Sequence, residues 1–229
     1  MVSASKAPSP PEANGPRRAL IRTTGLIGVL LPLLTIVPAS QMARKEPEFQ
    51  ATAQEVLEYY RSLNTVSGSI WSYLFTLGLF ALLWYMLCWS SLLRSVEPAP
   101  AWRSTIAAGS ATVVIALVTL GTIGVGNLRG DEIDPEIAQS IFDLGNANFA
   151  NAWIGLGSFA ILTGWVAGGA GLLPRWSAWW IALVGIGLIL SRAVWHEPVY
   201  WAPYLLFWLW IPVSSILLLR ARVPAQLNT

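Results

Sequence analysis

Six stretches of mainly apolar residues, each bounded by charge or proline, are the dominant pattern along the chain. A helix needs about 20 such residues to cross a bilayer. The pattern therefore predicts spans at about residues 19–38, 70–93, 104–125, 149–173, 176–195 and 199–219. The fifth reaches full length only if it includes Arg175 and runs to Trp195, which places Arg192 about one turn inside the boundary, where its side chain can snorkel. The predicted fold is all-α, a polytopic transmembrane helical bundle.

The composition agrees with this pattern. Hydrophobic residues make up 55% of the chain, charged residues 11%, and the mean hydropathy is +0.56. A soluble domain carries roughly 25% charged residues, so most of this surface is expected to face lipid. The net charge of +2 gives no reason to expect a nucleic-acid partner, and Cys88, the single cysteine, excludes an intrachain disulfide.

The ends of the chain read as tails around one membrane domain. Residues 1–16 are rich in Pro, Ser and Ala and predict a disordered segment, residues 17–222 form the membrane domain, and residues 223–229 are a short tail. Arg17 and Arg18, followed by a short apolar run and Val37-Pro38-Ala39, also resemble a secretory signal with its cleavage site. A retained first helix is the simpler interpretation, because further spans follow.

The basic residues predict the orientation, because cytoplasmic segments carry an excess of Lys and Arg. With the N-terminus inside, the inner segments hold nine: Lys6, Arg17, Arg18, Arg22, Arg94, Arg103, Arg175, Arg220 and Arg222. The outer segments hold five: Arg44, Lys45, Arg61, Arg129 and Arg192. Six spans with this asymmetry predict both termini in the cytoplasm.

Tryptophan supports the same boundaries, since an indole prefers the headgroup level of a bilayer. Nine of the 13 Trp residues fall near predicted span ends: Trp71, Trp153, Trp195 and Trp201 at outer ends, and Trp89, Trp102, Trp176, Trp179 and Trp180 at inner ends. The deeper ones are Trp84, Trp165, Trp208 and Trp210.

Both long outer loops carry helix signals. Residues 47–63 place Phe49, Val56, Leu57, Tyr60 and Leu63 at helical spacing with polar residues on the other faces, which predicts an amphipathic helix. In the second loop, Asp134 followed by Pro135 is typical of a helix start. We expect that helix to run to about Gly145, ahead of the fourth span.

Polar residues near the outer ends of the fourth and fifth spans form the candidate site. Its members are Arg192, His196, Glu197, Asp143, Asn146, Asn148 and Asn151. Arg192 and His196 are four apart and share a face if the fifth helix continues to Pro198. The group could bind a lipid headgroup or small solute, with Arg192 holding an anionic part. Alternatively, Arg192 pairs with Glu197 or Asp143, and the Asn side chains cap helix ends.

The lack of ionisable and catalytic residues in the central portions of the predicted spans argues against several classes of function. These portions hold no Asp, Glu, Lys or His, which argues against a pump, a proton-coupled carrier or a voltage sensor. Without an intramembrane Lys a retinal Schiff base is excluded, and one His excludes bis-His haem ligation. The acidic run from Asp131 to Glu136 lacks the spacing of a calcium loop. No catalytic or metal-binding constellation is recognised, and the sequence identifies no cofactor.

Glycines have a packing interpretation, because close approach of helices in lipid needs small residues. Gly164 and Gly168 form a small-xxx-small pair in the fourth span, and Gly185 and Gly187 lie in the fifth. The pattern leaves open whether these faces join helices of one bundle or of two subunits.

Three segments resemble a family of bacterial six-span membrane proteins filed as domains of unknown function. They are VLEYYRSLNTVSGSIWSYLFTLGLFALLWYMLCWSSLLRSVE at residues 56–97, FDLGNANFANAW at 142–153 and GLLPRWSAWWIALVG at 171–185. The resemblance implies a multi-pass protein of the bacterial cytoplasmic membrane. It supplies no activity and assigns no functional residue.

Two hypotheses of function follow. The first is a non-catalytic module, an accessory or assembly subunit or a binder of lipid or apolar ligand. Its partners would be membrane lipids and a membrane protein or a second copy of the chain. The second is a membrane enzyme or carrier that handles a lipid-like or small substrate at the outer polar cluster. The missing ionisable and catalytic groups favour the first.

Overall fold

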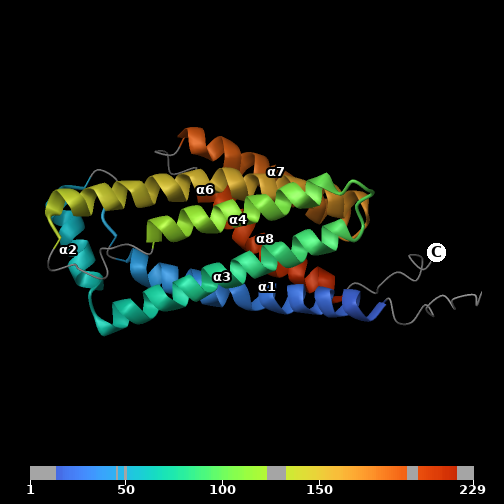
Figure 1. Cartoon of the computed structure of the whole chain (residues 1–229), viewed down its shortest axis with the longest axis horizontal. Helices are drawn as coiled ribbons and strands as arrows, with labels where there is room; N and C mark the ends of the chain where they lie inside the picture. Colours follow the sequence, from blue (N-terminus) through green and yellow to red (C-terminus); the bar gives the residue numbers. More distant parts are fainter. Residues whose placement is uncertain (1–13, 45, 49–50, 123–132, 195–200, 221–229) are drawn as a thin grey trace, which may run out of the picture.

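The computed structural model describes residues 14–44, 46–48, 51–122, 133–194 and 201–220. This part of the chain forms helices and no strand (Figure 1). The elements are α1 (Asn14–Ala43), α2 (Ala53–Leu63), α3 (Val66–Arg94), α4 (Trp102–Thr122), α6 (Pro135–Gly169), α7 (Arg175–Ser191), the short 3-10 helix η1 (Arg192–Val194) and α8 (Trp201–Arg220). All the α-helices except α2 are long and apolar enough to cross a membrane, which confirms the prediction of six apolar helices.

The six long helices form a closed ring. Each packs against its neighbours in chain order, α1 on α3, α3 on α4, α4 on α6, α6 on α7 and α7 on α8, and α8 closes the ring against α1. Successive helices run in opposite directions, so α1 begins and α8 ends at one end of the bundle (Figure 1). We call this the basic end. The opposite end, where α2 lies, is the α2 end.

Large aromatic side chains fill the middle of the ring. The biggest side chains that are fully buried include Trp89, Trp153, Trp210, Tyr85 and Phe159. The rings of Trp89 and Trp210 lie 5.6 Å apart, from centroid to centroid. Interiors pack as densely as organic crystals, and a ring of six helices encloses more space than aliphatic side chains alone can fill.

The outward faces are apolar and the interior holds small polar groups. On α3, Val66, Ile70, Tyr73, Leu77, Phe80 and Trp84 follow one another at helical spacing and are all exposed. Ser214, Ser215, Thr163 and Ser177 are fully buried. A water-soluble protein seldom exposes so continuous an apolar surface. The distribution fits an integral membrane protein that crosses the bilayer several times.

Hydrogen bonds between helices satisfy part of this polar interior. The Tyr85 hydroxyl on α3 lies 3.0 Å from the Ser214 hydroxyl on α8. The Trp210 indole on α8 donates to the Ser177 hydroxyl on α7 over 3.1 Å. Such bonds connect helices where no water is at hand, so α8 is bonded to α3 across the ring and to its neighbour α7.

Glycines allow α6 and α7 to approach each other closely. A Cβ on Gly157 would lie 2.5 Å from the Gly185 carbonyl oxygen, and a Cβ on Gly185 would lie 2.6 Å from the Gly157 oxygen. Further along the same seam, a Cβ on Gly164 would lie 2.5 Å from the Ala178 oxygen. These glycine faces therefore join helices within one chain. Around Gly109 on α4, by contrast, a Cβ would meet no atom within 4 Å.

Two expectations about helix ends are corrected. The helix that starts at Asp134 does not end near Gly145 but continues through the fourth span, so α6 is one helix of 35 residues. The start itself is as predicted: Asp134 is the N-cap, its side chain accepts from the Glu136 N–H over 2.9 Å, and Pro135 follows. No proline interrupts the segment, and a single glycine does not stop a helix that is packed on both sides. α7 ends at Ser191, and Arg192 begins η1 rather than continuing the α-helix.

Tryptophan locations are also partly corrected. Trp89 and Trp153, expected at the interface, are fully buried in the ring. Trp84 and Trp165, expected to lie deeper in the bilayer, are 66% and 57% exposed on the outer faces of their helices, which does not test their depth. Position along a span predicts depth in the bilayer, but it does not tell which side of the helix faces inward.

Candidate functional site

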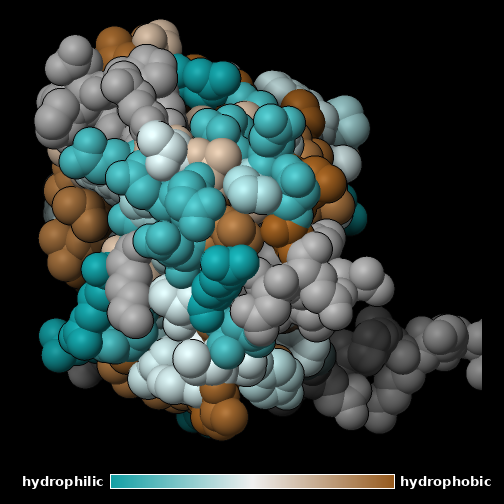
Figure 2. Space-filling model, turned by 90° about the vertical axis from the view of Figure 1, so that its left-hand side faces the viewer, coloured by the Kyte–Doolittle hydropathy of each residue, from teal (hydrophilic) through white to brown (hydrophobic). Residues whose placement is uncertain are grey.

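The apolar face of α2 packs against α6 and so holds α2 at the α2 end of the bundle. A capping box starts the helix: the Thr52 N–H donates to the Glu55 carboxylate over 2.7 Å, and the Glu55 N–H donates to the Thr52 hydroxyl over 3.4 Å. Val56, Leu57, Tyr60 and Leu63 are buried, and with Ala138 and Phe142 of α6 they form a separate small core. Figure 2 looks at this end and shows hydrophilic side chains gathered over it. α2 thus presents its polar face outward.

Asp143, the first member of the candidate site, lies beside α2. Burial raises the pKa of Tyr60 to about 12, helped by the negative charges of Glu46 and Asp143. The neighbouring Tyr59 packs edge-on against Phe142 of α6, with ring centroids 6.3 Å apart. The carboxylate of Asp143 is therefore close enough to Tyr60 of α2 to contribute to its raised pKa. It forms no ion pair with Arg192.

Arg192 is bound to Asn151. The Arg192 Nε donates to the Asn151 Oδ1 over 2.9 Å, so the side chain reaches from η1 across to α6. Both residues are partly exposed. The structure thus brings together two members of the candidate site from helices that are neighbours in the ring.

The other two asparagines stand on different sides of α6. Asn148 lies seven residues, two full turns, before Gly155, which packs on α4. Asn146 lies eleven residues, three full turns, before Gly157, which packs on α7, and its Nδ2 is buried without a hydrogen-bond partner. Because they point to different neighbours, Asn146 and Asn148 do not form one pocket. His196 and Glu197 lie outside the described residues.

The charge of Arg192 is not balanced by the part of the chain that the structure describes. Its hydrogen-bond partner is a neutral amide, and in this part no carboxylate lies within 4.0 Å of its nitrogen atoms. Nor do the described residues contain a group of three or more His, Cys, Asp or Glu side chains that could hold a metal ion. Among the described residues, the site therefore consists of the Arg192 guanidinium hydrogen-bonded to the Asn151 amide.

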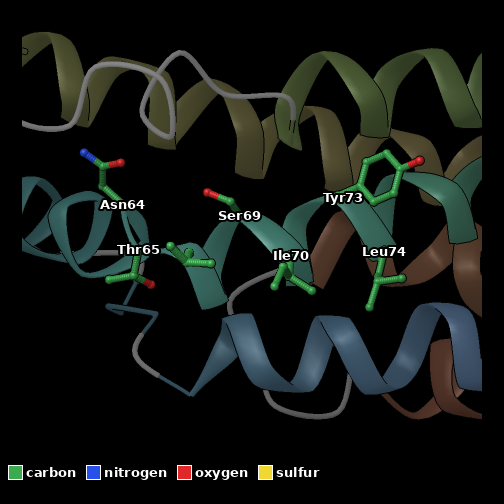
Figure 3. Close-up of a pocket in the computed structure, with 7 residues that line it drawn as sticks. Asn64, Thr65, Ser69, Ile70, Tyr73 and Leu74 are labelled. Atoms are coloured by element: carbon green, nitrogen blue, oxygen red, sulfur yellow. The ribbon is translucent and has the colours of Figure 1, made fainter.

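Two open hollows lie near α2. One, of about 590 Å³, is lined by Asn64, Thr65, Val66, Ser69, Ile70, Tyr73 and Leu74 along the first turns of α3 (Figure 3). Its polar residues serve the junction of α2 and α3: Asn64 is the C-cap of α2, and Thr65 caps α3 by accepting from the Gly68 N–H over 3.0 Å. The other, of about 660 Å³, is lined by the polar face of α2 with Glu48, Glu55 and Glu58. Both hollows therefore lie where α2 joins the rest of the bundle.

A polar cluster at the basic end was not expected from the sequence. Glu97, in the turn between α3 and α4, accepts from the Arg103 Nε over 2.7 Å and from the Ser104 N–H over 2.9 Å. Burial alone would raise the pKa of Glu97, but these hydrogen bonds and those from the Arg103 N–H lower it to about 2. The Glu97 side chain is fully covered, although the turn lies at the end of the bundle. A carboxylate at a helix N-terminus is a stable arrangement.

Arg103 also connects this turn to α6. Its guanidinium lies 5.1 Å from the ring centre of Trp165 and 5.7 Å from that of Trp102. Such contacts are worth about 0.5–1 kcal/mol each at exposed sites. The signal in the sequence was an acid six residues before an arginine around a helix start, which is too common a pattern to predict a contact. The cluster holds helices together and presents no free group for chemistry.

The fold is a bundle of six helices that are each long and apolar enough to cross a membrane, with the Arg192 guanidinium just after the end of α7. Comparison of the chain with models of protein families, with characterised proteins and with solved structures finds no match. The likeness of three segments to bacterial six-span proteins therefore stays a prediction.

Proposed function

We propose that this protein is a non-catalytic accessory or assembly module of the bacterial cytoplasmic membrane that binds an anionic lipid headgroup at its outer face through Arg192. In this proposal both termini are cytoplasmic and α2 lies outside. The observation that carries it is the lone pairing of Arg192 with Asn151 at the end of a membrane span.

An arginine near the boundary of the bilayer costs free energy unless an anion accompanies it. The neutral amide of Asn151 orients the guanidinium, and no carboxylate of the described residues compensates its charge. A phosphate or carboxylate of a lipid would form charge-assisted hydrogen bonds with the remaining N–H groups, which are roughly twice as strong as neutral ones. Arg192 is thus suited to hold an anionic headgroup.

The surface next to Arg192 suits the rest of a lipid. Ile154 lies about one turn from Asn151 toward the bilayer and is 45% exposed, and Trp165 lies further along the same side of α6. Both side chains are largely exposed, although Trp165 also contacts Trp102 and Arg103 of α4. An acyl chain could lie along it while the headgroup contacts Arg192.

The filled ring centre favours a binding module over a transporter. Trp89, Trp153 and Trp210 are fully buried where a path through the ring would run. Moving a solute past them would require several helices to separate. The same dense packing is what a rigid scaffold for lipid or partner subunits needs.

Native mass spectrometry of the protein purified in mild detergent tests the proposal. We expect anionic lipid to co-purify with the wild-type chain and Arg192→Gln to retain one lipid molecule fewer, while Arg192→Lys shows a smaller loss. Arg61→Gln is the control, because Arg61 is an exposed arginine of α2 at the same end. Unchanged retention in Arg192→Gln would show that Arg192 is structural. Capture of a small solute or a turned-over lipid product would instead support the enzyme or carrier hypothesis.

A further inference from the structure

Arginine gathers at the basic end with little acid to balance it. The arginines of this end are Arg17, Arg18, Arg22, Arg94, Arg103, Arg175 and Arg220. Of the described carboxylates, Glu97 alone lies at this end, and it is bound to Arg103. The other arginines therefore form a strongly cationic surface.

The contact between α1 and α8 draws four of these arginines into one seam. A Cβ on Gly25 would lie 2.5 Å from the Leu219 Cγ, so the two helices are in contact at this level. Arg22 lies about one turn before Gly25 on α1, and Arg220 directly follows Leu219 on α8. Because α1 and α8 run in opposite directions, both arginines project from the same level, with Arg17 and Arg18 a further turn out.

The charge of this seam indicates an anionic partner. Arg17, whose Nε is buried without a hydrogen-bond partner in the described structure, lies about 100° around α1 from Arg18, so it adds to the charge but stands outside the group of Arg18, Arg22 and Arg220. None of the four arginines of the seam has a described carboxylate within 4.0 Å. Self-repulsion within such a group is relieved when a multivalent anion binds between its members.

Apolar side chains continue the seam toward the middle of the bundle. Leu26, four residues after Arg22 and on the same side of α1, is 58% exposed, and Leu219 and Ile216 of α8 are each 41% exposed. Charge at the end and hydrocarbon directly beyond it match a molecule with an anionic head and acyl chains. A soluble phosphate compound or an acidic protein would use only the charged part.

We propose that the α1–α8 seam at the basic end is a binding site for an anionic phospholipid. The phosphate is held by Arg18, Arg22 and Arg220, and the acyl chains lie on Leu26, Ile216 and Leu219. Zwitterionic lipids fit less well, because their ammonium group adds a like charge to the arginines. This site is at the opposite end from Arg192 and does not depend on the proposed function.

Titration of the delipidated full-length protein in mild detergent, followed by native mass spectrometry, tests the proposal. The probes are phosphatidylglycerol and phosphatidylcholine with identical acyl chains, and inorganic phosphate as the headgroup without a tail. We expect phosphatidylglycerol to bind best. A cationic residue near a membrane surface contributes about 1 kcal/mol, so each Arg→Gln change should weaken binding about fivefold and the triple variant Arg18→Gln/Arg22→Gln/Arg220→Gln about 100-fold.

Matched variants make the result decisive. Arg175→Gln removes an exposed arginine of the same end outside the seam and should leave affinity unchanged. Replacing Arg18, Arg22 and Arg220 together by Lys should keep most of the preference for phosphatidylglycerol, which a merely misfolded variant would not. Equal binding of both lipids, wild-type affinity in the triple Gln variant, or displacement of the lipid by millimolar phosphate would each overturn the proposal.

Discussion

Adding one methyl group to Gly157 should weaken the bundle more than adding it to Gly109. Both glycines lie inside apolar helices, so Ala brings each the same intrinsic gain of about 1 kcal/mol in helix propensity. The surroundings differ. The new Cβ at position 157 would lie 2.5 Å from the Gly185 oxygen, whereas at position 109 it would meet nothing within 4 Å.

The magnitude follows from this geometry. Ordinary contact begins at 3.4 Å, so α6 and α7 must separate by about 0.9 Å, and the obstructing atom belongs to a helix backbone that cannot rotate away. Overpacking of this kind typically costs about 1–3 kcal/mol. Because propensity cancels in the comparison, Gly157→Ala should be about 1–3 kcal/mol less stable than Gly109→Ala.

The assay is reversible unfolding by a denaturing detergent in mixed micelles, followed by tryptophan fluorescence. Gly185→Ala should resemble Gly157→Ala, because its Cβ would lie 2.6 Å from the Gly157 oxygen. The double variant should lose less than the sum of the two, since helices already forced apart tolerate a second methyl group. Equal stability of Gly157→Ala and Gly109→Ala would refute the close approach of α6 and α7.

The remaining predictions concern packing, topology and charge. Gly168→Leu should lower thermal stability more than Gly109→Leu, because a Cβ at position 168 would already lie 2.7 Å from the Ala178 Cβ; equal losses would contradict this. Reporter fusions at Thr229 and within residues 47–63 should report cytoplasmic and external locations; a cytoplasmic first loop or a mature chain starting at Ser40 would overturn the orientation. Glu97→Gln should cost about 1–3 kcal/mol at neutral pH. Because the pKa of Glu97 is lowered in the folded state to about 2, the wild type should lose this contribution as the pH falls from about 4.5 toward 2, and Glu97→Gln should not.

The number and approximate limits of the long helices could be predicted because hydropathy over 20 residues is a strong signal. The start of α6 was equally accessible, since Asp134 and Pro135 act locally. The end predicted near Gly145 was wrong, because the sequence between the two apolar stretches contains no residue that stops a helix.

Which face of each helix points into the bundle was harder to predict. Trp89 and Trp84 are five residues apart on α3, yet one is fully buried and the other is 66% exposed. In a membrane helix both faces are apolar, so periodicity does not distinguish the face that meets neighbours from the face that meets lipid. The pairing of Arg192 with Asn151 depends on α6 and α7 being neighbours, which a single sequence does not state.

The two proposed lipid sites do not depend on the orientation of the bundle in the membrane. Inverting the bundle in the membrane would exchange the leaflets that Arg192 and the α1–α8 seam face. It would not change the contact of Arg192 with Asn151 or that of Gly25 with Leu219. A reversed result from the reporter fusions would therefore still leave the affinities in detergent to be measured. The excess of arginine at the basic end bears on both the orientation and the binding of anions. It favours retention of that end on the cytoplasmic side, and it leaves guanidinium groups that no carboxylate of the described residues neutralises.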